Sequence, residues 1–402
     1  MAVAELDSID ETDVAGKTVL VRADFNVPMA DGKVTDATRI ERAAPGITSL
    51  ADRGATVVLL SHFGRPKGAR SPDLSLAPIA EAASSVFGTP VVFADDCVGA
   101  AARQAIESAG AGGIVLLENL RFHAGEEAND DAFAADLAAL GDLYVNDAFS
   151  CAHRAHASTA AITQHMPSYA GPLLLAEVEA LQKAVETPTP PTMAVVGGAK
   201  VSTKIPVLTN LVEKVDKLVV GGGMANTFLL ANGFPIGKSL AEPDFIDTAR
   251  AIMTQAAARN CAILLPQDVT VATEFKAHAP SRTSGLNDVL EDEMILDVGP
   301  ATIAMLIEAA KRCKTVLWNG PLGAFEMQPF DTGTVKLAEA VATATDEGHV
   351  VSVAGGGDTV AALNAAGVAD RFSYVSTAGG AFLEWLEGRE LPGIAALAKA
   401  SP

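Results

Sequence analysis

The chain has 402 residues, of which 49% are apolar and 19% charged, and its formal net charge is −20 at pH 7. A single hydrophobic core rarely serves so long a chain, so a globular protein of two domains is expected. The acidic balance argues against a nucleic-acid surface, which requires a basic face, and it means that any anionic substrate needs a local basic pocket.

The first half of the chain alternates short apolar runs with longer amphipathic stretches. Between the first two runs, Ile40, Ala43, Ile47 and Leu50 recur every three or four residues, which predicts a helix with one buried face. This alternation is typical of βαβ units around a parallel sheet. The strands expected in this half are residues 18–21, 56–60, 91–93, 114–117 and 143–145.

The same pattern starts again after about residue 170. A helix is expected over residues 176–185, and Pro188, Pro190 and Pro191 after it indicate a break between domains. The strands expected in the second half are residues 194–196, 218–220, 262–265, 316–318, 350–353 and 373–375.

The two patterns together predict two α/β domains of Rossmann-like character, each a parallel sheet flanked by helices. We assign residues 1–172 to the first domain, 173–187 to a hinge helix and 188–389 to the second domain. The tail, residues 390–402, is expected to pack back on the first domain. Ligands of open parallel sheets bind at the carboxyl ends of the strands, so polar clusters there are the candidate sites.

Several glycine clusters follow strands of the second half, but they do not form the common nucleotide-binding motifs. G-x-G-x-x-G is absent, and the nearest Walker A candidate, residues 233–239, is one residue too short. Neither a Rossmann dehydrogenase nor a P-loop enzyme is therefore indicated. Repeated glycines before helices still favour a nucleotide phosphate site, because they let backbone N–H groups approach an anion closely. The clusters are residues 197–198, 221–223, 355–357 and 379–380.

Arginine and histidine follow the strands of the first half. Residues 22–28, 61–66, 117–123 and 151–156 each bring an Arg or a His to a strand end, and Arg39 lies on the helix after the first strand. Arginine forks match phosphate and carboxylate oxygens in pairs. The sequence therefore predicts a cationic pocket for a small, multiply charged anion in an otherwise acidic protein.

The motifs at these strand ends resemble those of the phosphoglycerate kinase family, in the family's order from residue 18 to residue 388. No single motif is decisive, but the ordered set is highly specific. In the first half they are Arg-x-Asp-Phe-Asn-Val-Pro at 22–28, Ser-His-x-Gly-Arg-Pro at 61–66, Glu-Asn-Leu-Arg-Phe at 118–122 and Ala-His-Arg-Ala-His at 152–156. In the second half they are Gly-Gly-Ala-Lys-Val at 197–201, Gly-Gly-Gly-Met at 221–224, Trp-Asn-Gly-Pro-x-Gly at 318–323 and Gly-Gly-Gly-Asp-Thr at 355–359.

The resemblance implies reversible phosphoryl transfer from 1,3-bisphosphoglycerate to ADP, giving 3-phosphoglycerate and ATP, with Mg²⁺ on the nucleotide. It implies that the phosphoglycerate is bound by Asp24, Asn26, Arg39, His62, Phe63, Gly64, Arg65, Arg121 and Arg154. It implies that the nucleotide is bound by Lys200, Lys204, Asn319, Glu326, Gly355, Gly356, Gly357, Asp358 and Thr359. Asp358 is the implied magnesium ligand, with helix N-capping as the alternative role.

The implied reaction needs no strong general base, because a carboxylate acceptor is already ionised at neutral pH. It needs neutralisation of the charge on the moving phosphoryl group and exclusion of water. Arg39 from one domain and Lys200 from the other are the catalytic candidates, and the two domains are expected to close around the hinge helix. Backbone N–H groups of Gly379 and Gly380, which are expected to open the last major helix, would assist.

Two positions depart from the family's pattern, Ala378 and Ile295, where glycine is usual. Ala378 would be strained if its φ had to be positive, and the Ile295 side chain would reshape the nucleoside pocket. The alternatives left open are another two-domain kinase with a carboxylate substrate, a catalytically silent binding protein and a nucleic-acid-binding protein.

The cysteines and the apolar segments of the sequence indicate in which cellular compartment the protein is expected. Cys97, Cys151, Cys261 and Cys313 lie far apart with no C-x-x-C pair, so neither disulfides nor a zinc site are expected. Cys151 as a nucleophile is less favoured than Cys151 as a small packing residue. Residues 1–13 lack the apolar core of a signal peptide, and no apolar stretch is long enough to span a bilayer. A cytoplasmic monomer is expected, without membrane or nucleic-acid partners.

Overall fold

The computed structural model describes residues 6–400 and divides them into two compact units. The C-terminal unit is Glu179–Arg389, and the N-terminal unit comprises the described residues up to Val178 together with those from Glu390. Helix α6 (Pro172–Leu181) crosses this division and continues as a short π-helix to Glu186. The outer limits expected for the first domain and the tail, at residues 1–5 and 401–402, lie outside the described residues.

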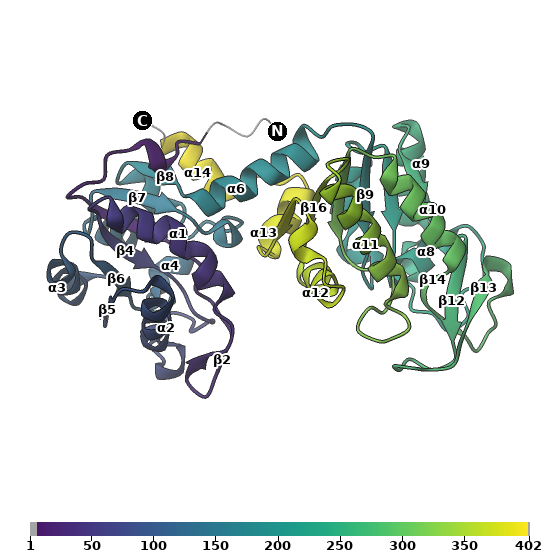
Figure 1. The fold of residues 1–402 in the computed structure, drawn as a ribbon, viewed down its shortest axis with the longest axis horizontal. Coiled ribbons are helices and arrows are strands. Elements are labelled where there is room, and N and C mark those ends of the chain that lie inside the picture. Colours follow the sequence, from purple (N-terminus) through teal and green to yellow (C-terminus); the bar gives the residue numbers. More distant parts are fainter. Residues whose placement is uncertain (1–5, 401–402) are drawn as a thin grey trace. The chain divides into compact units, whose positions relative to one another are not determined.

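The N-terminal unit is built on a parallel sheet. Six strands of the described chain form it in the order β5-β6-β4-β1-β7-β8, with β1 in the middle between β4 and β7 (Figure 1). The five strands predicted in this half are confirmed, and the sixth, β8, is a three-residue strand that the pattern did not indicate. Their bounds are β1 (Thr18–Arg22), β4 (Thr56–Leu60), β5 (Val91–Ala94), β6 (Ile114–Leu117), β7 (Leu143–Asn146) and β8 (Ser168–Ala170).

Helices cover this sheet and close its core. The predicted apolar stripe is confirmed in α1, which buries Ile40, Ile47 and Leu50 against the β-strands. The C-terminal helix α14 belongs to this unit, and the Gly393 N–H donates to the Ala152 carbonyl at 2.9 Å. The helices of the unit are α1 (Thr38–Asp52), α2 (Ala77–Phe87), α3 (Gly99–Ala109), α4 (Ala124–Glu127), α5 (Asp131–Ala138) and α14 (Pro392–Ala400); a small hairpin joins β2 (Met29–Ala30) to β3 (Lys33–Val34).

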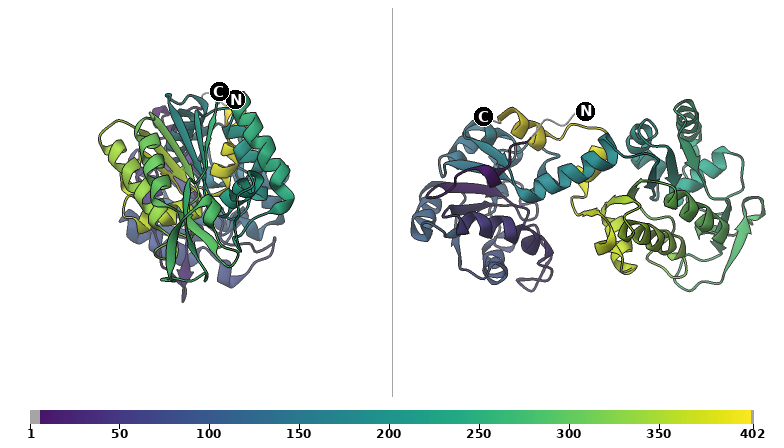
Figure 2. Two further views of the ribbon diagram at one scale, coloured as in Figure 1. Left: turned by 90° about the vertical axis from the view of Figure 1, so that its right-hand side faces the viewer. Right: turned by 45° about the horizontal axis from the view of Figure 1, so that its top comes forward.

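The C-terminal unit repeats the same architecture. Within the described residues its parallel sheet has six strands in the order β11-β10-β9-β15-β16-β17, and helices lie on both faces of it (Figure 2). The predicted α/β class is therefore confirmed for both units. The strands are β9 (Thr192–Val196), β10 (Lys217–Val220), β11 (Ala262–Leu264), β15 (Thr315–Asn319), β16 (Val351–Gly355) and β17 (Tyr374–Ser376). The helices are α7 (Ile205–Leu211), α8 (Gly223–Ala231), α9 (Ile246–Ala258), α10 (Pro300–Lys311), α11 (Thr332–Asp346), α12 (Gly357–Ala365) and α13 (Gly380–Leu386).

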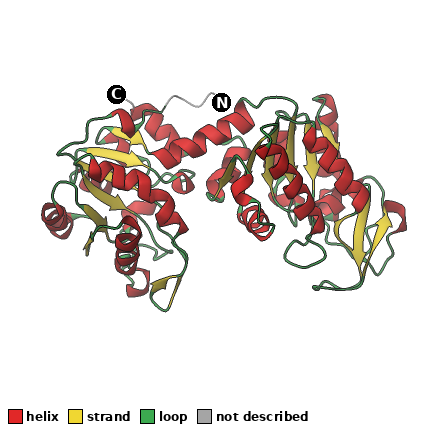
Figure 3. Cartoon of the chain, viewed as in Figure 1, coloured by secondary structure: helices red, strands yellow, loops and turns green. Residues whose placement is uncertain are grey.

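A second, antiparallel sheet in the C-terminal unit was not predicted (Figure 3). Strand β12 (Asp268–Ala272) pairs with β13 (Ser281–Gly285) and with β14 (Met294–Val298). Strand β13 has the sequence Ser-Arg-Thr-Ser-Gly with one buried residue, Ser284, so it offers no apolar run to recognise. Its pairing with β12, rather than its own hydrophobic pattern, makes it a strand.

One helix prediction near the C-terminus was wrong. Gly380 does open a helix, α13, but this helix has seven residues and is not the last major helix, since α14 follows with nine. No helix within residues 6–400 is both long and apolar enough to cross a membrane.

Candidate active site

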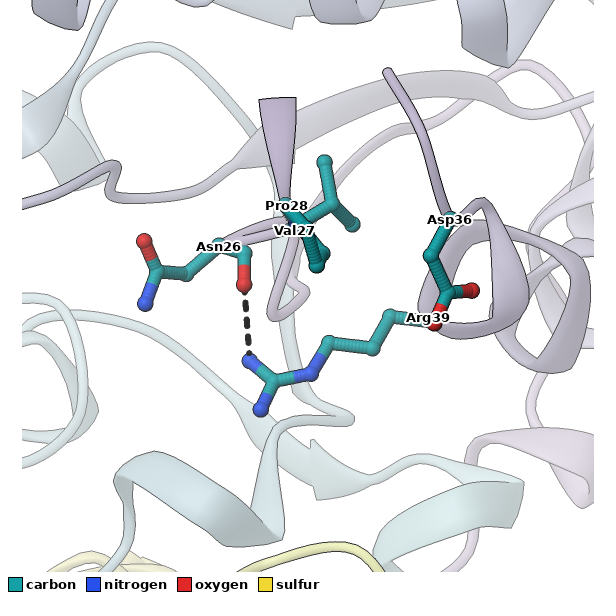
Figure 4. Close-up of a pocket in the computed structure, with 5 residues that line it drawn as sticks. All are labelled: Asn26, Val27, Pro28, Asp36 and Arg39. Atoms are coloured by element: carbon teal, nitrogen blue, oxygen red, sulfur yellow. Dashed lines mark hydrogen bonds between the residues drawn. The ribbon is translucent and has the colours of Figure 1, made fainter. Parts of the chain in front are cut away.

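The loop that leaves β1 and the start of α1 line a pocket of about 420 Å³ in the N-terminal unit. Arg39 is the second residue of α1, and its side chain extends across the pocket to the backbone of the loop (Figure 4). Because β1 lies in the middle of a parallel sheet, this loop is at the carboxyl edge where α/β proteins bind ligands. The pocket is lined by Asn26, Val27, Pro28, Asp36 and Arg39.

Asp24 and Arg39 form an ion pair beside this pocket. Arg39 Nη1 lies 2.7 Å from Asp24 Oδ2 and 3.1 Å from the Asn26 carbonyl oxygen, and the Ser150 hydroxyl donates to the same carboxylate. Burial by itself would raise the pKa of Asp24, but the charge of Arg39 and the other nearby donors outweigh it and lower that pKa. The aspartate thus holds Arg39 in place, while the Arg39 side chain stays 36% exposed towards the pocket.

Arg22 and His62 form a second contact deeper in the same unit. The Arg22 guanidinium is fully buried, and its Nη2 lies 3.0 Å from Nδ1 of His62. A guanidinium has only donors, so Nδ1 of His62 must accept and its proton must sit on Nε2. Burial, followed by the charge of Arg22, holds the pKa of His62 well below its usual range. His62 is therefore a neutral side chain with Nε2–H as its remaining donor.

Sequence reasoning did not assign a role to the groups that support Arg22. Arg22 Nε donates to Ser158 Oγ at 2.9 Å, and Ser158 Oγ donates to the buried Glu126 carboxylate at 2.7 Å. The Ser158 N–H also donates to Glu126, at 3.0 Å. The network Glu126–Ser158–Arg22 thus satisfies a buried positive charge through hydrogen bonds. The one signal available in the sequence was Arg22 itself, a cation at the end of an apolar strand.

Three further predicted residues are joined by hydrogen bonds around Gly64. The Gly64 N–H donates to Asn26 Oδ1 at 3.0 Å, and Arg121 Nη1 donates to the Gly64 carbonyl at 2.8 Å. Phe63 precedes this glycine and is held by Asn119, which accepts from its N–H at 3.2 Å and donates to its carbonyl at 2.7 Å. The structure therefore brings Asn26, Gly64 and Arg121 together through direct contacts.

Arg65 and Arg154 make no hydrogen bond or ion pair to the other members of this network. Both side chains are exposed. Arg154 Nε lies 3.3 Å from the ring of its neighbour His153, and Arg65 makes no hydrogen bond or ion pair to any other described residue. Two guanidinium groups thus remain available on loops that follow strands of the N-terminal unit.

In the C-terminal unit, Lys204, which immediately precedes α7, and Asn319 connect to the ends of β15 and β16. Lys204 Nζ donates to Asn319 Oδ1, and Asn319 Nδ2 donates to the Gly355 carbonyl at 2.8 Å. The Gly320 N–H donates to the hydroxyl of Thr359 at 2.7 Å. Burial lowers the pKa of Lys204, and the charge of Asp358 acts in the opposite direction. Asp358 is therefore close enough to Lys204 to interact with it electrostatically.

Three glycines lie at different strand-end turns of this unit, where a larger residue would be strained or would clash. Gly356 has φ of +99° and is the N-cap of α12, and Gly379 has φ of +42° and precedes α13. A side chain on Gly197 would place its Cβ 1.9 Å from the Pro321 carbonyl oxygen. These glycines leave the first N–H groups of α12 at an exposed turn, where an anion is favoured.

Lys200, Glu326 and Asp358 have exposed side chains. None of the three side chains makes a hydrogen bond or ion pair to another residue within 6–400. Asp358 lies in the first turn of α12, whose N-cap is Gly356 and has no side-chain cap. Asp358 is therefore not the N-cap of α12. Its carboxylate oxygens are available to a hard cation such as Mg²⁺.

The two positions that depart from the family pattern fit their surroundings. Ala378 is buried and its φ is not positive, so it carries no strain of that kind. The next residue, Gly379, has the positive φ. Ile295 lies in β14, where its side chain packs with Val269 and Val271. The short Walker A candidate at 233–239 follows α8 instead of a strand, which is the wrong context for a P-loop.

Comparison with known proteins agrees with this geometry. A family model described as phosphoglycerate kinase matches residues 9–389. The phosphoglycerate kinase of Rhodospirillum centenum is 61% identical over 390 residues, covering 97% of this chain and 98% of that protein, and that of Bradyrhizobium diazoefficiens is 59% identical with the same coverage. The solved structure of phosphoglycerate kinase from Coxiella burnetii is similar with a TM-score of 0.92 and 44% identity, covering 99% of this chain and 100% of that one. The chain therefore belongs to the phosphoglycerate kinase family and functions as a phosphotransferase of glycolysis.

Proposed function

We propose that this member of the family uses the residues described above to transfer a phosphoryl group reversibly between 1,3-bisphosphoglycerate and ADP. The observation that carries the proposal is the set of guanidinium groups around β1 and α1, in a chain whose net charge is −20. Such a local cationic cluster binds a small multiply charged anion even though the protein's overall field opposes it.

The N-terminal unit holds the phosphoglycerate in this proposal. Arg39, Arg65, Arg121 and Arg154 supply charged donors for the phosphate and carboxylate oxygens. His62 supplies a neutral Nε2–H donor, as required by the Arg22 contact at its other nitrogen. Asp24 acts by positioning Arg39. The polar groups that orient the remainder of the substrate are Asn26, Phe63 and Gly64.

The C-terminal unit holds the nucleotide. Gly355 ends β16, and the turn of Gly356 and Gly357 after it presents N–H groups of α12 to the phosphates. Lys204 adds a positive charge that Asn319 orients, and Thr359 fixes the neighbouring loop through Gly320. Glu326 provides an exposed acceptor for hydroxyl or amino groups of the nucleoside.

Asp358 would hold the Mg²⁺ that accompanies ADP and ATP. Magnesium keeps several water ligands and usually takes one or two carboxylates from a protein together with phosphate oxygens. Bound in this way, the ion supplies charge neutralisation to the phosphates. Asp358 has an exposed carboxylate in the first turn of α12 that makes no hydrogen bond to another described residue, which fits this role.

Catalysis in this proposal is positioning and charge neutralisation, without a general base. The acceptor is an ionised carboxylate in one direction and a phosphate oxygen in the other, so no proton must be removed. Arg39 and Lys200 neutralise the charge on the transferred group, with help from the N–H groups of Gly379 and Gly380. Transfer requires the two bound substrates to be brought together and shielded from water by hinge-bending, which is part of the proposal.

The test is turnover of Mg-ATP with and without 3-phosphoglycerate, followed by ADP release, with the acyl phosphate product trapped to pull the reaction. ADP release that depends strictly on 3-phosphoglycerate supports the proposal. Release without it identifies a nucleotide hydrolase, and dependence on a different carboxylate identifies another substrate. We also propose that the protein acts as a cytoplasmic monomer, which sedimentation of the pure protein checks.

A further inference from the structure

We propose that Asp96, Cys97 and His123 form a binding site for Zn²⁺ in the N-terminal unit, outside the proposed phosphoglycerate residues. One ligand atom from each of the three side chains lies within 4.8 Å of the other two. Asp96 and Cys97 follow β5, and His123 follows a 3-10 helix at Leu120–Phe122. The spacing of the cysteines does not indicate this site, because the histidine comes from a different strand-end loop.

The three side chains are held in position by their neighbours. His123 Nε2 lies 2.8 Å from Asp96 Oδ1, and the His123 ring stacks on Phe133 with centroids 5.0 Å apart and planes at 19°. The loop after β5 is fixed at Asp95, whose carbonyl accepts from Arg70 Nη1 at 2.9 Å. A site whose ligands are already oriented loses little conformational freedom when an ion binds.

The geometry requires only a small adjustment. Zinc binds sulfur at about 2.3 Å, nitrogen at about 2.0–2.1 Å and carboxylate oxygen at about 2.0–2.2 Å in tetrahedral sites, so ligand atoms end roughly 3.3–3.8 Å apart. His123 Nε2 and Asp96 Oδ1 are 2.8 Å apart and would have to separate by roughly 0.5–1 Å, while Cys97 Sγ, which lies within 4.8 Å of both, would have to approach by about 1 Å at most. His123 and Asp96 are 34% and 43% exposed, so the ion can enter from solvent and water can fill the fourth position.

Charge and proton balance favour a divalent ion at this cluster. The Cys97 thiol loses one proton to solvent, and His123 binds through Nε2 with its proton on Nδ1. The aspartate and the thiolate then carry two negative charges, which Zn²⁺ neutralises. The carboxylates of Asp96, Glu126 and Glu118 lie close enough to act electrostatically on Cys97, and they favour a cation there.

A second cluster of the same kind, Asp24, His62 and Cys151, is a poorer site for a cation. Arg39 lies 2.7 Å from Asp24, and Arg22 lies 3.0 Å from His62. Both guanidinium groups would repel a metal ion there. Near the Asp96 cluster, Arg70 pairs with Asp95 and lies 3.8 Å from Glu118, and no lysine or arginine among the described residues forms an ion pair with Asp96.

The mixed sulfur, nitrogen and oxygen ligands also make this site select a different ion from the magnesium that accompanies the nucleotide. Mg²⁺ selects oxygen ligands, whereas a mixed set with thiolate and imidazole suits Zn²⁺. Excess Mg²⁺ should therefore leave zinc at this site. Because binding releases the thiol proton, the affinity for Zn²⁺ should fall as the pH is lowered.

The test is titration of the metal-free full-length protein with Zn²⁺ by calorimetry, and with Co²⁺ as a spectroscopic substitute. We expect one ion per chain and a thiolate-to-cobalt absorption band, and both should be lost in Cys97→Ala. In His123→Gln the affinity for the ion should fall about tenfold or more. Turnover of Mg-ATP with 3-phosphoglycerate should be unchanged in the metal-free Cys97→Ala variant, which shows that the variant is folded.

Two controls make the outcome decisive. Cys261→Ala removes a buried thiol elsewhere and should bind zinc as the wild type does. Cys151→Ala tests the competing cluster. Zinc binding that survives Cys97→Ala, or that is lost in Cys151→Ala, would overturn the proposal, as would the absence of any Zn²⁺ binding to the wild type.

Discussion

Arg39 combines two properties that a charge-neutralising residue needs. Its guanidinium is oriented by Asp24 at 2.7 Å, and it is still 36% exposed to the pocket. We expect Arg39→Ala, and Lys200→Ala in the other unit, to lower kcat on the order of 10³-fold, as for other cations that act on a transferring phosphoryl group. Steady-state kinetics with saturating substrates measures the effect.

Matched controls for these variants exist in both units. Arg103 is an exposed arginine on α3, and Lys276 is an exposed lysine of the C-terminal unit. Arg103→Ala and Lys276→Ala should retain wild-type kcat. An Arg39 or Lys200 variant within tenfold of the wild type would remove that residue from the catalytic set.

Asp358 is expected to act through the metal ion. Its carboxylate does not cap α12 and is exposed, so Asp358→Ala should disturb the helix little. The variant should require a higher Mg²⁺ concentration for half-maximal activity while its KM for 3-phosphoglycerate stays unchanged. A magnesium titration that coincides with the wild-type curve would dismiss Asp358 as a ligand.

The buried network behind His62 makes a separate prediction. Ser158→Ala leaves the Arg22 Nε and the Glu126 carboxylate without their shared partner, so we expect a loss of stability of about 1–3 kcal/mol. We also expect a raised KM for 3-phosphoglycerate, since Arg22 no longer fixes the neutral tautomer of His62. Nitrogen NMR of His62 reports the tautomer directly.

Ser168→Ala is the matched control for this network. Ser168 is equally buried, and its hydroxyl donates to the Met166 carbonyl at 2.8 Å and makes no hydrogen bond to Arg22 or Glu126. It should lose stability without a change in the KM for 3-phosphoglycerate. If Ser158→Ala behaved in the same way as Ser168→Ala, the network would be purely structural.

Whether a residue could be predicted from the sequence depends on the sequence separation between it and the residues that it contacts. Asp24, Asn26 and Arg39 lie within one strand-end loop and the next helix, so a local pattern identifies them. Arg22 contacts Ser158 across 136 positions, and that pairing depends on how the chain folds. A contact between residues so far apart in the sequence produces no local pattern from which it could be predicted.

At the scale of elements, the same argument separates the two kinds of sheet. Parallel strands buried on both faces are continuous apolar runs, so residues 56–60 and 114–117 were predicted with their observed bounds. Strand β13 is a polar strand of a small antiparallel sheet and lacks such a run. Its existence depends on a partner strand that the sequence of β13 does not reveal.

The first turn of α6 donates hydrogen bonds to a buried aspartate from another loop, Asp147, and this contact makes the stability of the fold depend on pH. Asp147 Oδ1 accepts from the N–H groups of Leu173 and Leu174 at 2.7 and 3.1 Å. Burial raises the pKa of Asp147 to about 7, against the opposing effect of these hydrogen bonds. The folded state therefore binds the proton more tightly than the unfolded state, and this favours folding at low pH.

We expect the contribution of Asp147 to be complete below its unfolded pKa, near 4, and to be lost as the pH rises through about 7. The asparagine side chain of Asp147→Asn does not ionise. As the pH rises through this window, the free energy of unfolding of the variant should therefore increase relative to that of the wild type, on the order of a few kcal/mol. Urea unfolding from about pH 4 to pH 8 measures this change in the free energy of unfolding. Asp297, whose pKa burial also raises to about 7, should still titrate in this variant. Parallel curves for variant and wild type would contradict the assignment.

At the scale of the whole molecule, both proposed substrates are anions and the protein is strongly acidic. Each unit therefore has to supply its own local cations, and the candidate residues are divided accordingly. Arg39 and Arg121 belong to the N-terminal unit, and Lys200 and Lys204 belong to the C-terminal unit. This division predicts that each ligand alone stabilises one unit.

Hydrogen exchange with mass spectrometry tests that division, because ligand contacts suppress local opening of the backbone. With 3-phosphoglycerate alone, we expect slower exchange around residues 22–28 and 61–66 and little change around 355–359. With Mg-ADP alone, we expect the reverse. The physical reason is that the hydrogen-bonded loops which would contact each ligand lie within one compact unit.

Lys204→Ala provides the control that makes this experiment specific. The Lys204 side chain orients on Asn319, which in turn bonds the Gly355 carbonyl, so its loss should remove protection by Mg-ADP at 355–359. Protection by 3-phosphoglycerate at 22–28 should remain, since none of the groups involved there lies in the C-terminal unit. Protection of both loops by either ligand alone would contradict the division, and the substrate and nucleotide residues would then have to be reassigned.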